Sequence, residues 1–555
     1  MDKSPLIWIL KRLRKRIPAI LLMTAAQVGN ALFLVFFALG SRGVIDSAVA
    51  GDSVAFRQAC WTQGGIILGI LVCLAVLRHL RERLRADMER DWKQRLLHGL
   101  LHGEYSAVSQ YHSGELVNRL NNDVNKINDG VLTILPGAAA MVTRLVAAVV
   151  VLGVLDGRFT ILIAAVGAVV ILGTGIMRRR LKELNKQVSQ QDGKVSGFIQ
   201  ETIEKLLMVQ AMDTADEVER RSDTIMDTRY NLQRKRKNIS LLTNTGISVM
   251  FYGAGFAALV WCANRLLHGQ MSFGSLTAVI QLVNQVQTPF VDLSGVMPKY
   301  AAMIASAERL MELEQIRSEP KPAGESPQSM YSRMETLEAD KLSFAYDREQ
   351  ILTEATFSLP KGAFAVITGP SGIGKSTLLK LLLGVFSPDS GELSVRGQGG
   401  SVTLDRSTRR LFAYVPQGNL LLSGTLRENL TIVRPDATQQ EIDRAVYVSG
   451  MDEYLPQLPK GLDTPLGENG AGLSEGQAQR LAIARAVLGG APILLLDECT
   501  SALDTETEQT VLRRLRELPD RTCIAVTHRP AAIALCDWRM DVGSGKIRCV
   551  KADAE

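Results

Sequence analysis

The sequence predicts an α-helical membrane domain followed by an α/β domain built on a parallel sheet. Six apolar runs in the first part of the chain are long enough to cross a bilayer. The glycine-rich segment Gly369–Thr377 lies between a strand-like run and a helix-like run, as a phosphate-binding loop does. The apolar run Ile493–Leu496 is typical of a strand buried on both faces of a parallel sheet. With 555 residues, the chain has room for both domains.

The apolar runs predict six membrane-spanning helices. They cover about residues 17–40, 62–79, 131–154, 158–177, 239–263 and 274–298. Only residues 156–158 separate the third run from the fourth, which predicts a tight hairpin. The first dozen residues, with Trp8 and a basic end, predict a helix lying at the membrane interface before the first span.

Basic residues predict the orientation of these spans. They cluster before the first and fifth spans and after the second and fourth, whereas the opposite loops contain few. Because positively charged loops stay in the cytoplasm, we expect the N-terminus, the connections 80–130 and 178–238 and the C-terminal half to be cytoplasmic. The design suits a bacterial inner membrane. These clusters account for the net charge of +6, so the lipid bilayer is an expected partner and nucleic acid is not.

The two long connections are rich in helix-forming residues and predict helical extensions of the spans. Breaks at 103–114 and at about 207–216 predict two short transverse helices that contact a cytoplasmic domain. The predicted organisation is a membrane domain with these two coupling helices over 1–318, a linker over 319–334 and the α/β domain over 335–555.

The sixth apolar run carries a polar stripe on one helix face. Its residues are Gln281, Asn284, Gln285, Thr288 and Asp292. Polar side chains in a span avoid lipid, so the stripe either forms hydrogen bonds between helices or lines a water-filled cavity. A cavity of amides and one carboxylate suits a polar or amphiphilic molecule, including a cationic one. A peptide, a drug and a lipid-like molecule are all compatible with it.

The glycine-rich loop predicts ATP binding. Its glycines let backbone N–H groups approach phosphates, and the following helix adds the favourable end of its dipole. We expect Lys375 to contact the β- and γ-phosphates and Ser376 to ligate Mg²⁺. The other predicted phosphate-binding residues of the loop are Gly369, Ser371, Gly372, Gly374 and Thr377.

Two carboxylates follow the buried run and predict hydrolysis. We expect Asp497 to hold Mg²⁺, directly or through water, and Glu498 to act as general base on the attacking water. Phosphoryl transfer depends mainly on positioning and on charge neutralisation. Gln417 can reach Mg²⁺ and the water, and His528 can contact the γ-phosphate. The predicted cofactors are ATP and Mg²⁺.

These motifs, in this order, resemble the ATP-binding cassette (ABC) family. Leu473–Gln477 is similar to its signature pentapeptide and Ser501–Asp504 to its D-loop. Tyr111–Leu120 and Gly269–Gly274 are similar to segments of the exporter branch. The resemblance covers nearly the whole chain. It implies a half-transporter with the type IV exporter fold, in which six spans are fused to one P-loop NTPase cassette and two chains cross their spans.

The resemblance also implies roles for single residues. The ATP-binding residues that it adds are Tyr346, Ser474, Gly476, Gln477 and Asp504. Tyr346 would stack on adenine, while Ser474 and Gly476 would contact ATP held by the opposite subunit. The chain departs from the family at Glu475, where glycine is common, and at Asn469, where many exporters have arginine.

The intact catalytic set predicts an ATP-driven exporter that works by alternating access. It favours a homodimer, because heterodimers of the family often contain one degenerate site. The expected partners are therefore a second identical chain and an exported small molecule, peptide or lipid. The alternative is a cassette protein that gates a channel or regulates a partner complex, a function that degenerate catalytic residues would favour.

Overall fold

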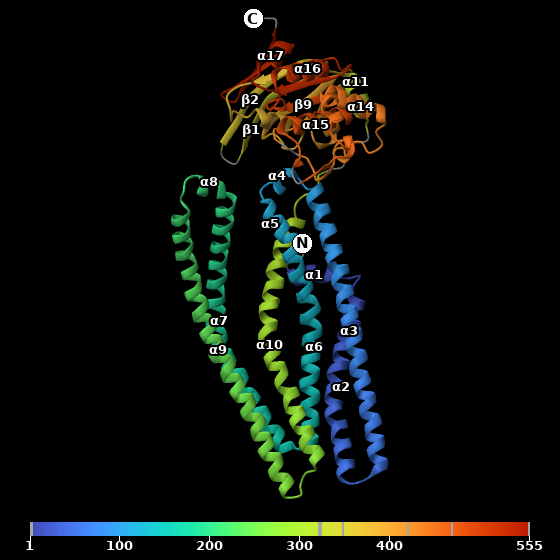
Figure 1. Cartoon of the computed structure of the whole chain (residues 1–555), viewed down its shortest axis with the longest axis vertical. Helices are drawn as coiled ribbons and strands as arrows, with labels where there is room; N and C mark the ends of the chain where they lie inside the picture. The colour runs from blue at the N-terminus through green and yellow to red at the C-terminus, as the bar shows by residue number, and fades with distance from the viewer. Residues whose placement is uncertain (1–3, 320–324, 347–348, 419–420, 468–469, 553–555) are drawn as a thin grey trace. The chain divides into compact units, whose positions relative to one another are not determined.

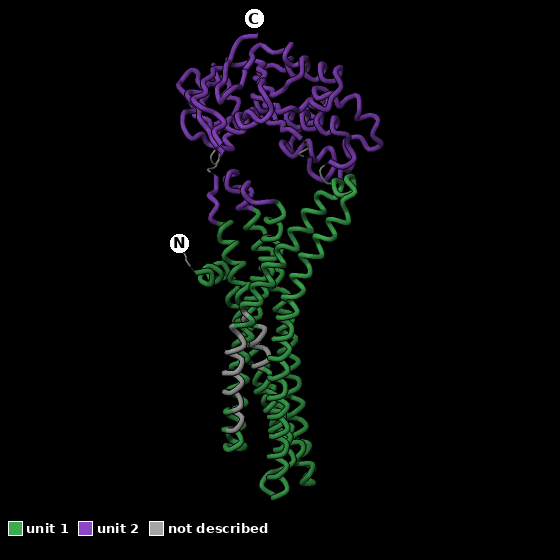
Figure 2. Tube along the Cα trace, turned by 90° about the vertical axis from the view of Figure 1, so that its left-hand side faces the viewer, with its two compact units in different colours: residues 1–97, 113–314 green, residues 98–112, 315–555 purple. Residues whose placement is uncertain are grey.

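The computed structural model describes residues 4–319, 325–346, 349–418, 421–467 and 470–552. Within its helices, the side chains of residues 162–164, 166–179, 182, 247, 289–295 and 297 lie outside this description. The chain divides into two compact units (Figure 2). The first comprises residues 1–97 and 113–314, and the second comprises residues 98–112 and 315–555.

Long helices form the first unit (Figure 1). They are α2 (Ile17–Val49), α3 (Ser53–His102), α6 (Val124–Leu155), α7 (Gly157–Glu204), α9 (Ala215–Leu267) and α10 (Phe273–Glu314). The helix α6 packs against α2 and α10, and α7 packs along α9. By length and composition, four stretches of the described residues can cross a membrane, and they lie in α2, α3, residues Ser113–Leu155 and α9. The fourth and sixth predicted spans coincide with α7 and α10, whose apolar stretches include side chains outside the description.

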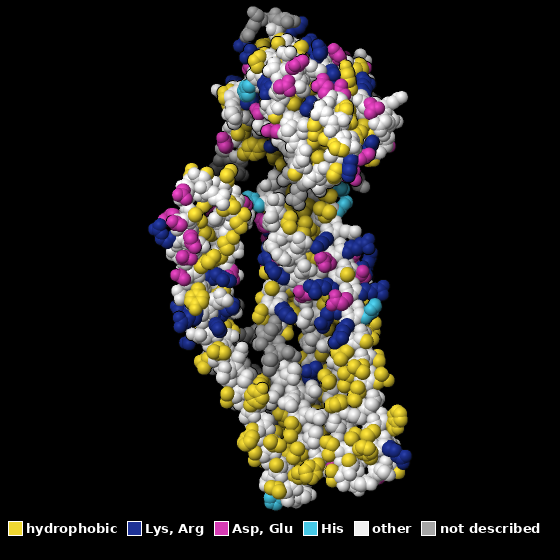
Figure 3. All heavy atoms as spheres, viewed as in Figure 1, with side chains coloured by type: hydrophobic (Ala, Val, Ile, Leu, Met, Phe, Trp, Pro, Cys, Tyr) yellow, Lys and Arg dark blue, Asp and Glu magenta, His cyan; other side chains and the backbone are white. Residues whose placement is uncertain are grey.

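The surface of the first unit follows the predicted charge pattern. In the view of Figure 3, hydrophobic side chains cover its lower part, and Lys and Arg side chains gather above them. Short helices occupy both predicted breaks in the long connections. The helices α4 (Tyr105–Val108) and α8 (Leu206–Ala211) lie at these breaks, α5 (Ser113–Asn118) begins at the end of the first break, and the π-helix η1 (Arg119–Asp123) follows α5.

The predicted N-terminal helix is α1 (Pro5–Arg12), and one of its faces packs against protein. Its Trp8 is buried, with its ring centroid 5.0 Å from that of Trp92 on α3. The Trp8 Nε1 donates to Glu314 Oε2 at 2.9 Å, at the end of α10. The other face exposes Leu6, Ile7 and Leu10. Only that second face is free for the predicted membrane interface.

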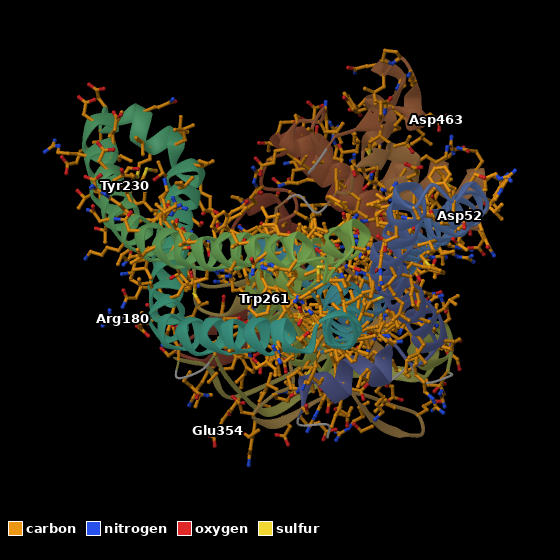
Figure 4. The ribbon with its side chains drawn as sticks, turned by 90° about the horizontal axis from the view of Figure 1, so that it is seen from below. Asp52, Arg180, Tyr230, Trp261, Glu354 and Asp463 are labelled. Carbon is orange, nitrogen blue, oxygen red and sulfur yellow. The ribbon has the colours of Figure 1, made fainter. Side chains whose placement is uncertain are left out.

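An aspartate caps the predicted hairpin between α6 and α7. Asp156 Oδ1 accepts from the Phe159 backbone N–H at 3.2 Å, which satisfies a donor in the first turn of α7. Its Oδ2 accepts from Trp261 Nε1 at 3.0 Å and from Arg265. Trp261 comes from α9 and is labelled in Figure 4, and its ring centroid lies 6.3 Å from that of Phe159. The hairpin is thereby fixed to α9.

A buried ion pair joins α6 to α10. Arg309 donates to both oxygens of Asp123, at 2.7 and 2.6 Å, and Ser306 Oγ donates to the same carboxylate at 3.0 Å. The Asp123 side chain is fully buried. The π-helix that ends at Asp123 also brings Arg119 to α10, where its Nη1 donates to the Arg309 carbonyl at 2.8 Å.

The second unit contains a six-stranded sheet in the order β12-β11-β3-β10-β9-β6. Its strands are β3 (Phe364–Thr368), β6 (Phe412–Val415), β9 (Ile493–Asp497), β10 (Thr522–Val526), β11 (Trp538–Gly543) and β12 (Lys546–Lys551). All neighbouring pairs are parallel except β11 with β12. All five residues of β9 are buried, as the sequence predicted for this run.

A second, antiparallel sheet has the order β2-β1-β4-β5. It consists of β1 (Met334–Tyr346), β2 (Glu349–Pro360), β4 (Ser390–Gly397) and β5 (Gly400–Thr403). One hydrophobic cluster joins this sheet and helix α12 (Lys375–Leu382) to the parallel sheet. Another joins the parallel sheet to the helices α13 (Leu426–Thr431), α14 (Gln439–Val448), α15 (Glu475–Leu488) and α16 (Thr505–Arg516).

The smaller elements complete the second unit. They are α11 (Pro327–Arg333), α17 (Pro530–Leu535), the strand pair β7 (Gly424–Thr425) and β8 (Pro465–Leu466), and the 3₁₀ turns η2 (Arg406–Leu411), η3 (Met451–Glu453), η4 (Leu455–Gln457) and η5 (Gly461–Asp463). The helix α11 falls in the predicted linker. Its Tyr331 is buried, and the hydroxyl forms a 2.9 Å hydrogen bond with Thr522 Oγ1 at the start of β10.

The segment Gly269–Gly274 packs closely against the end of α2. Asp46 accepts from the Gly274 backbone N–H at 2.9 Å and from Ser272 Oγ at 2.9 Å. A Cβ at Gly274 would clash with the Arg42 carbonyl oxygen. This position therefore requires glycine because the backbone of α2 approaches it.

We predict that Gly274→Ala destabilises the protein by about 1–3 kcal/mol, because the added methyl group overpacks the contact with Arg42. The control is Gly253→Ala on α9, where an added Cβ meets nothing within 4 Å. It should be neutral or stabilising by up to about 1 kcal/mol. Melting temperatures of the purified variants in detergent measure the difference, and equal values for both variants would contradict this account of Gly274.

Candidate nucleotide-binding site

The predicted phosphate loop connects β3 to α12 and has a backbone that only glycine adopts readily. Gly369, Gly372 and Gly374 have φ values of 143°, 80° and 106°. A Cβ at Gly369 would clash with the Val542 carbonyl, and one at Gly374 would clash with Ile351. The glycines therefore serve the shape of the loop as well as the approach of a ligand.

The lysine of this loop is held inside the loop itself. The Lys375 side chain is buried, and its Nζ donates to the carbonyls of Gly369 and Pro370 at 2.8 and 2.9 Å. Ser371 is exposed at the tip of the loop. The ammonium group thus lies along the inner side of the loop, where a phosphate would be bound.

Asp497, at the end of β9, is joined to the phosphate loop. Its Oδ1 accepts from Ser376 Oγ at 3.1 Å, and its Oδ2 accepts from the Tyr414 hydroxyl at 3.2 Å. Burial raises the pKa of Asp497 above its usual value, and the charge of Glu498 adds to this, whereas the two hydrogen bonds lower it. Burial and the nearby Asp497 also raise the pKa of Tyr414. Ser376 and Asp497 provide the oxygen ligands that Mg²⁺ prefers.

Glu498 has a left-handed backbone, with φ of 49°. A non-glycine residue in this region is strained by about 1–3 kcal/mol and is often found at a functional site. Its backbone N–H donates to the Val526 carbonyl at 3.0 Å, and its Oε2 accepts from Gln417 Nε2 at 2.7 Å. Gln417 follows β6 and lies in an exposed position. The structure therefore brings two of the predicted catalytic residues into direct contact.

The third predicted catalytic residue, His528, follows β10 and is exposed. The strand β10 lies between β3 and β9, and all three run parallel. The phosphate loop, His528 and Glu498 therefore all lie at the carboxyl edge of one sheet, where ligands of open α/β sheets bind.

Tyr346, at the end of β1, adjoins the phosphate-loop helix. Its hydroxyl accepts a 3.4 Å hydrogen bond from Thr377 Oγ1, and its ring packs edge-on against Phe386 with centroids 5.4 Å apart. The residue is 37% exposed. A partly exposed ring next to the loop is available for stacking.

The segment that resembles the family signature caps α15. Ser474 Oγ accepts from the Gln477 backbone N–H at 3.3 Å, and Gln477 Oε1 accepts from the Ser474 backbone N–H at 2.8 Å, which is a capping box. The unusual Glu475 is exposed in the first turn, where the helix dipole favours an acidic residue. A Cβ at Gly476 would lie 2.9 Å from the Ala502 carbonyl.

Asp504 likewise serves as a helix cap, because it accepts from the Thr507 backbone N–H at 2.9 Å at the start of α16. That hydrogen bond and the Thr507 hydroxyl lower the pKa of Asp504. Asn469 lies outside the described residues.

The predicted polar stripe on α10 divides into buried and exposed members. Gln281 is partly buried, and its Oε1 has no partner among the described residues. Gln285 is half-buried, whereas Asn284 and Thr288 are exposed, and the Thr288 hydroxyl donates to the Asn284 carbonyl at 2.9 Å. The Asp292 side chain lies outside the description. Buried and exposed positions on one face leave both interpretations of the stripe open.

Tyr414 and Arg144 are among the residues that the sequence analysis did not single out. Tyr414 holds the buried Asp497, and its only signal in the sequence was an aromatic residue in the strand-like run before Gln417. Arg144 lies half-buried in α6, within the third predicted span. A single charge inside an apolar run is a recognised signal of a functional position.

Two family models match the chain. The ABC transporter transmembrane region matches residues 17–290, and the ABC transporter model matches residues 352–501. The chain is a member of the ABC transporter family. This ABC protein fuses the membrane region and the cassette in one chain, so it is an integral membrane half-transporter whose cassette binds ATP and couples its hydrolysis to export.

Relatives and a solved structure agree with this assignment. The half-transporter is 28% identical to an ATP-dependent lipid A-core flippase from Desulfotalea psychrophila, over 95% of this chain and 91% of the flippase. It is 27% identical to a probable ABC transporter ATP-binding/permease protein from Haemophilus influenzae, over 95% of both chains. It is 31% identical to the cyclolysin secretion/processing ATP-binding protein CyaB of Bordetella pertussis, over 67% of this chain and 52% of CyaB.

The fold is shared with a bacterial Atm1-family ABC exporter solved with ATP bound. The TM-score is 0.78 at 23% identity, and the match covers 97% of this chain and 95% of that chain. The predicted family, the exporter fold and the transport ATPase are confirmed. The roles of single site residues stay predictions.

We predict that Tyr414→Phe lowers stability by about 1–3 kcal/mol, because it leaves a buried oxygen of Asp497 without its donor. Tyr447→Phe is the control, since Tyr447 lies on α14 and is 52% exposed. Thermal unfolding of both variants tests this expectation. A Tyr414→Phe protein that melts with the Tyr447→Phe control would show that the hydroxyl does not stabilise the carboxylate.

Proposed function

We propose that the half-transporter works as a homodimer with two ATP sites, each of which combines the phosphate loop of one chain with the signature segment of the other. Within each chain, the contact between Glu498 and Gln417, at the sheet edge that carries Asp497, is the observation that most strongly supports a site competent for hydrolysis. This contact supports hydrolysis, because a carboxylate and an amide meet at the sheet edge where, in this proposal, the terminal phosphate is bound.

In this proposal, different residues of one chain bind the phosphates, Mg²⁺ and the adenine ring. Lys375 exchanges its two carbonyl partners for phosphate oxygens and neutralises their charge. Ser376 and Asp497 would hold Mg²⁺, which supplies further neutralisation of the phosphates when bound. Tyr346 stacks on the adenine ring, which its partly exposed position next to Thr377 allows.

Hydrolysis requires an oriented water. Glu498 accepts a proton from the water, and Gln417 holds the water and the carboxylate in line. His528 donates to the γ-phosphate from the neighbouring strand end. Glu498 follows β9 directly and has a left-handed backbone, a conformation often found at functional sites.

The homodimer follows from what each chain provides. Ser474 and Gly476 lie at the start of α15, and the exposed Ser474 and Glu475 leave this end of the helix open to the ATP of a partner. The chain keeps every expected catalytic residue, so two identical chains make two competent sites. We further propose a bacterial inner membrane with the cassette in the cytoplasm, which the distribution of basic residues supports.

For the cargo, we propose a polar or amphiphilic molecule that is bound beside α10. Asn284 and Thr288 are exposed on this helix, and Gln281 Oε1 is buried without a partner among the described residues. The names of the similar proteins refer to a lipid, lipid A-core, and to cyclolysin secretion, which keeps lipids and peptides in the panel to be tested.

The first test is the Mg-ATPase activity of the purified chain in lipid, beside Glu498→Gln. Loss of the general base should lower kcat by a factor of about 10²–10⁴. Peptides, amphiphilic drugs and lipids are then added in turn, and the class that stimulates hydrolysis identifies the cargo. A lone chain that stays inert at saturating Mg-ATP contradicts the homodimer.

The composite sites are tested by complementation. Lys375→Ala inactivates the phosphate loop of a chain, and Ser474→Arg blocks the signature segment that it offers to a partner. Mixed dimers of the two inactive variants retain one intact site, so an equal mixture should recover about a quarter of wild-type activity. The control mixes wild type with the Lys375→Ala/Ser474→Arg double variant, whose mixed dimers have no intact site. If each site belongs to a single chain, the first mixture stays inactive.

A further inference from the structure

The segment that carries His528 is tied to the loop that follows Glu498 by one side chain. Arg529 Nη1 donates to the Leu503 carbonyl at 2.8 Å and to Glu508 Oε2 at 3.1 Å. Its Nη2 donates to the Ser501 carbonyl. The planar guanidinium therefore fixes two carbonyls of this loop and a carboxylate at once.

Glu508 holds this guanidinium in place. The carboxylate is 2% exposed, and its other oxygen, Oε1, accepts from Thr500 Oγ1 at 2.9 Å. Removal of the cationic partner of a buried carboxylate strongly destabilises the fold. Arg529 is therefore restrained on the loop side even though its own side chain is partly exposed.

The other side of His528 is restrained as well. The Arg529 backbone N–H donates to Thr527 Oγ1 at 3.1 Å, and the Thr527 backbone N–H donates at 3.4 Å to the carbonyl of Ile367 in β3, which leads into the phosphate loop. His528 thus projects from a three-residue segment that is anchored at both ends.

The loop that Arg529 contacts, residues 501–503, is itself hydrogen-bonded to α15. Gln479 of α15 donates from Nε2 to Ser501 Oγ at 2.9 Å and accepts at Oε1 from the Ala502 backbone N–H at 3.1 Å. Gln479 is buried, and Gly476 lets the Ala502 carbonyl approach the same helix closely. The His528 segment is therefore held in position relative to α15 through this loop.

We propose that Arg529 is a positioning residue for ATP hydrolysis, which holds His528 in reach of the γ-phosphate by joining its segment to residues 501–503 and to Glu508. This inference rests on the role proposed above for His528. It predicts that loss of Arg529 slows the chemical step and leaves ATP binding nearly unchanged, because the phosphate loop and Tyr346 stay in place.

Loss of a residue that only stabilises the fold would not slow the chemical step while leaving ATP binding unchanged. Arg514 is a matched control for this distinction. Arg514 Nη1 donates to the Tyr447 carbonyl and to Asp452 Oδ1, the latter at 3.0 Å. It also bonds one carboxylate and backbone, and it lies at the far end of α16 from the loop that Arg529 holds. Arg514→Met therefore removes similar interactions away from His528.

The experiment measures kcat and KM of Mg-ATP hydrolysis, together with melting temperature, for the full chain in lipid. The variants are Arg529→Met, Arg529→Lys, His528→Ala, His528→Ala/Arg529→Met and Arg514→Met. Arg529→Met should lower kcat by a factor of about 10–100 while KM changes by less than about threefold. Arg514→Met should also lower the melting temperature, by less than Arg529→Met because Asp452 is more exposed than Glu508, and it should keep kcat within about twofold. The double variant should be no slower than His528→Ala alone, because Arg529 acts through His528.

Arg529→Lys keeps the positive charge beside Glu508 but cannot bond two carbonyls, so it separates positioning from folding. We expect it to fold with a near-normal melting temperature and to lose kcat by a factor of about ten. A wild-type rate in Arg529→Lys and Arg529→Met, or losses that multiply in the double variant, would overturn the inference while His528→Ala stays slow. A wild-type rate in His528→Ala would instead remove the proposed role of His528, and this inference with it.

Discussion

The parallel hydrogen bonding of β3, β10 and β9 is the constraint on which the nucleotide site depends. Val526 pairs with Ile367 on one side and with Asp497 on the other, so the three strands end level with one another. The phosphate loop, His528 and Glu498 follow these strand ends, so the strand register alone brings them to one edge of the sheet. A slip of one residue would displace a strand end by about 3.3 Å and turn its side chains to the opposite face.

Around this edge the polar side chains form two layers. The inner layer would face the nucleotide, and the outer layer holds it in place, as Tyr414 does for Asp497 and Arg529 for the His528 segment. These outer-layer side chains are only partly exposed and are hydrogen-bonded by protein, so the fold resists their displacement. The membrane helices use the same solution at Asp123, where a buried carboxylate is satisfied by Arg309.

The sequence was sufficient to predict the order of the elements and the motifs that supply the inner layer, while the roles of its single residues stay predictions. The glycines of the phosphate loop and the buried run of β9 are local signals that do not depend on tertiary structure. The outer layer escaped prediction because Tyr414 and Asp497 are 83 residues apart and meet only through strand order. The packing of α1 was missed for the same reason, since Trp8 meets Glu314 across 306 residues. The left-handed backbone of Glu498 was not predicted either, because no sequence pattern marks this conformation in a residue other than glycine.

The hydrogen bond between Tyr331 and Thr522 has a mechanical consequence. It fastens α11, which follows directly on the segment leaving the first unit, to the first residue of β10, and Lys361 Nζ reinforces it 4.7 Å from the tyrosine ring. A pull on that segment would therefore act on a central strand of the parallel sheet as well as on β1, which follows α11 in the chain. Thr522 begins β10 and His528 lies just beyond its other end, so tension along this strand would reach the residue that we propose contacts the γ-phosphate. The hydrogen bond to α11 and the proposed catalytic residue His528 therefore lie at opposite ends of the same strand.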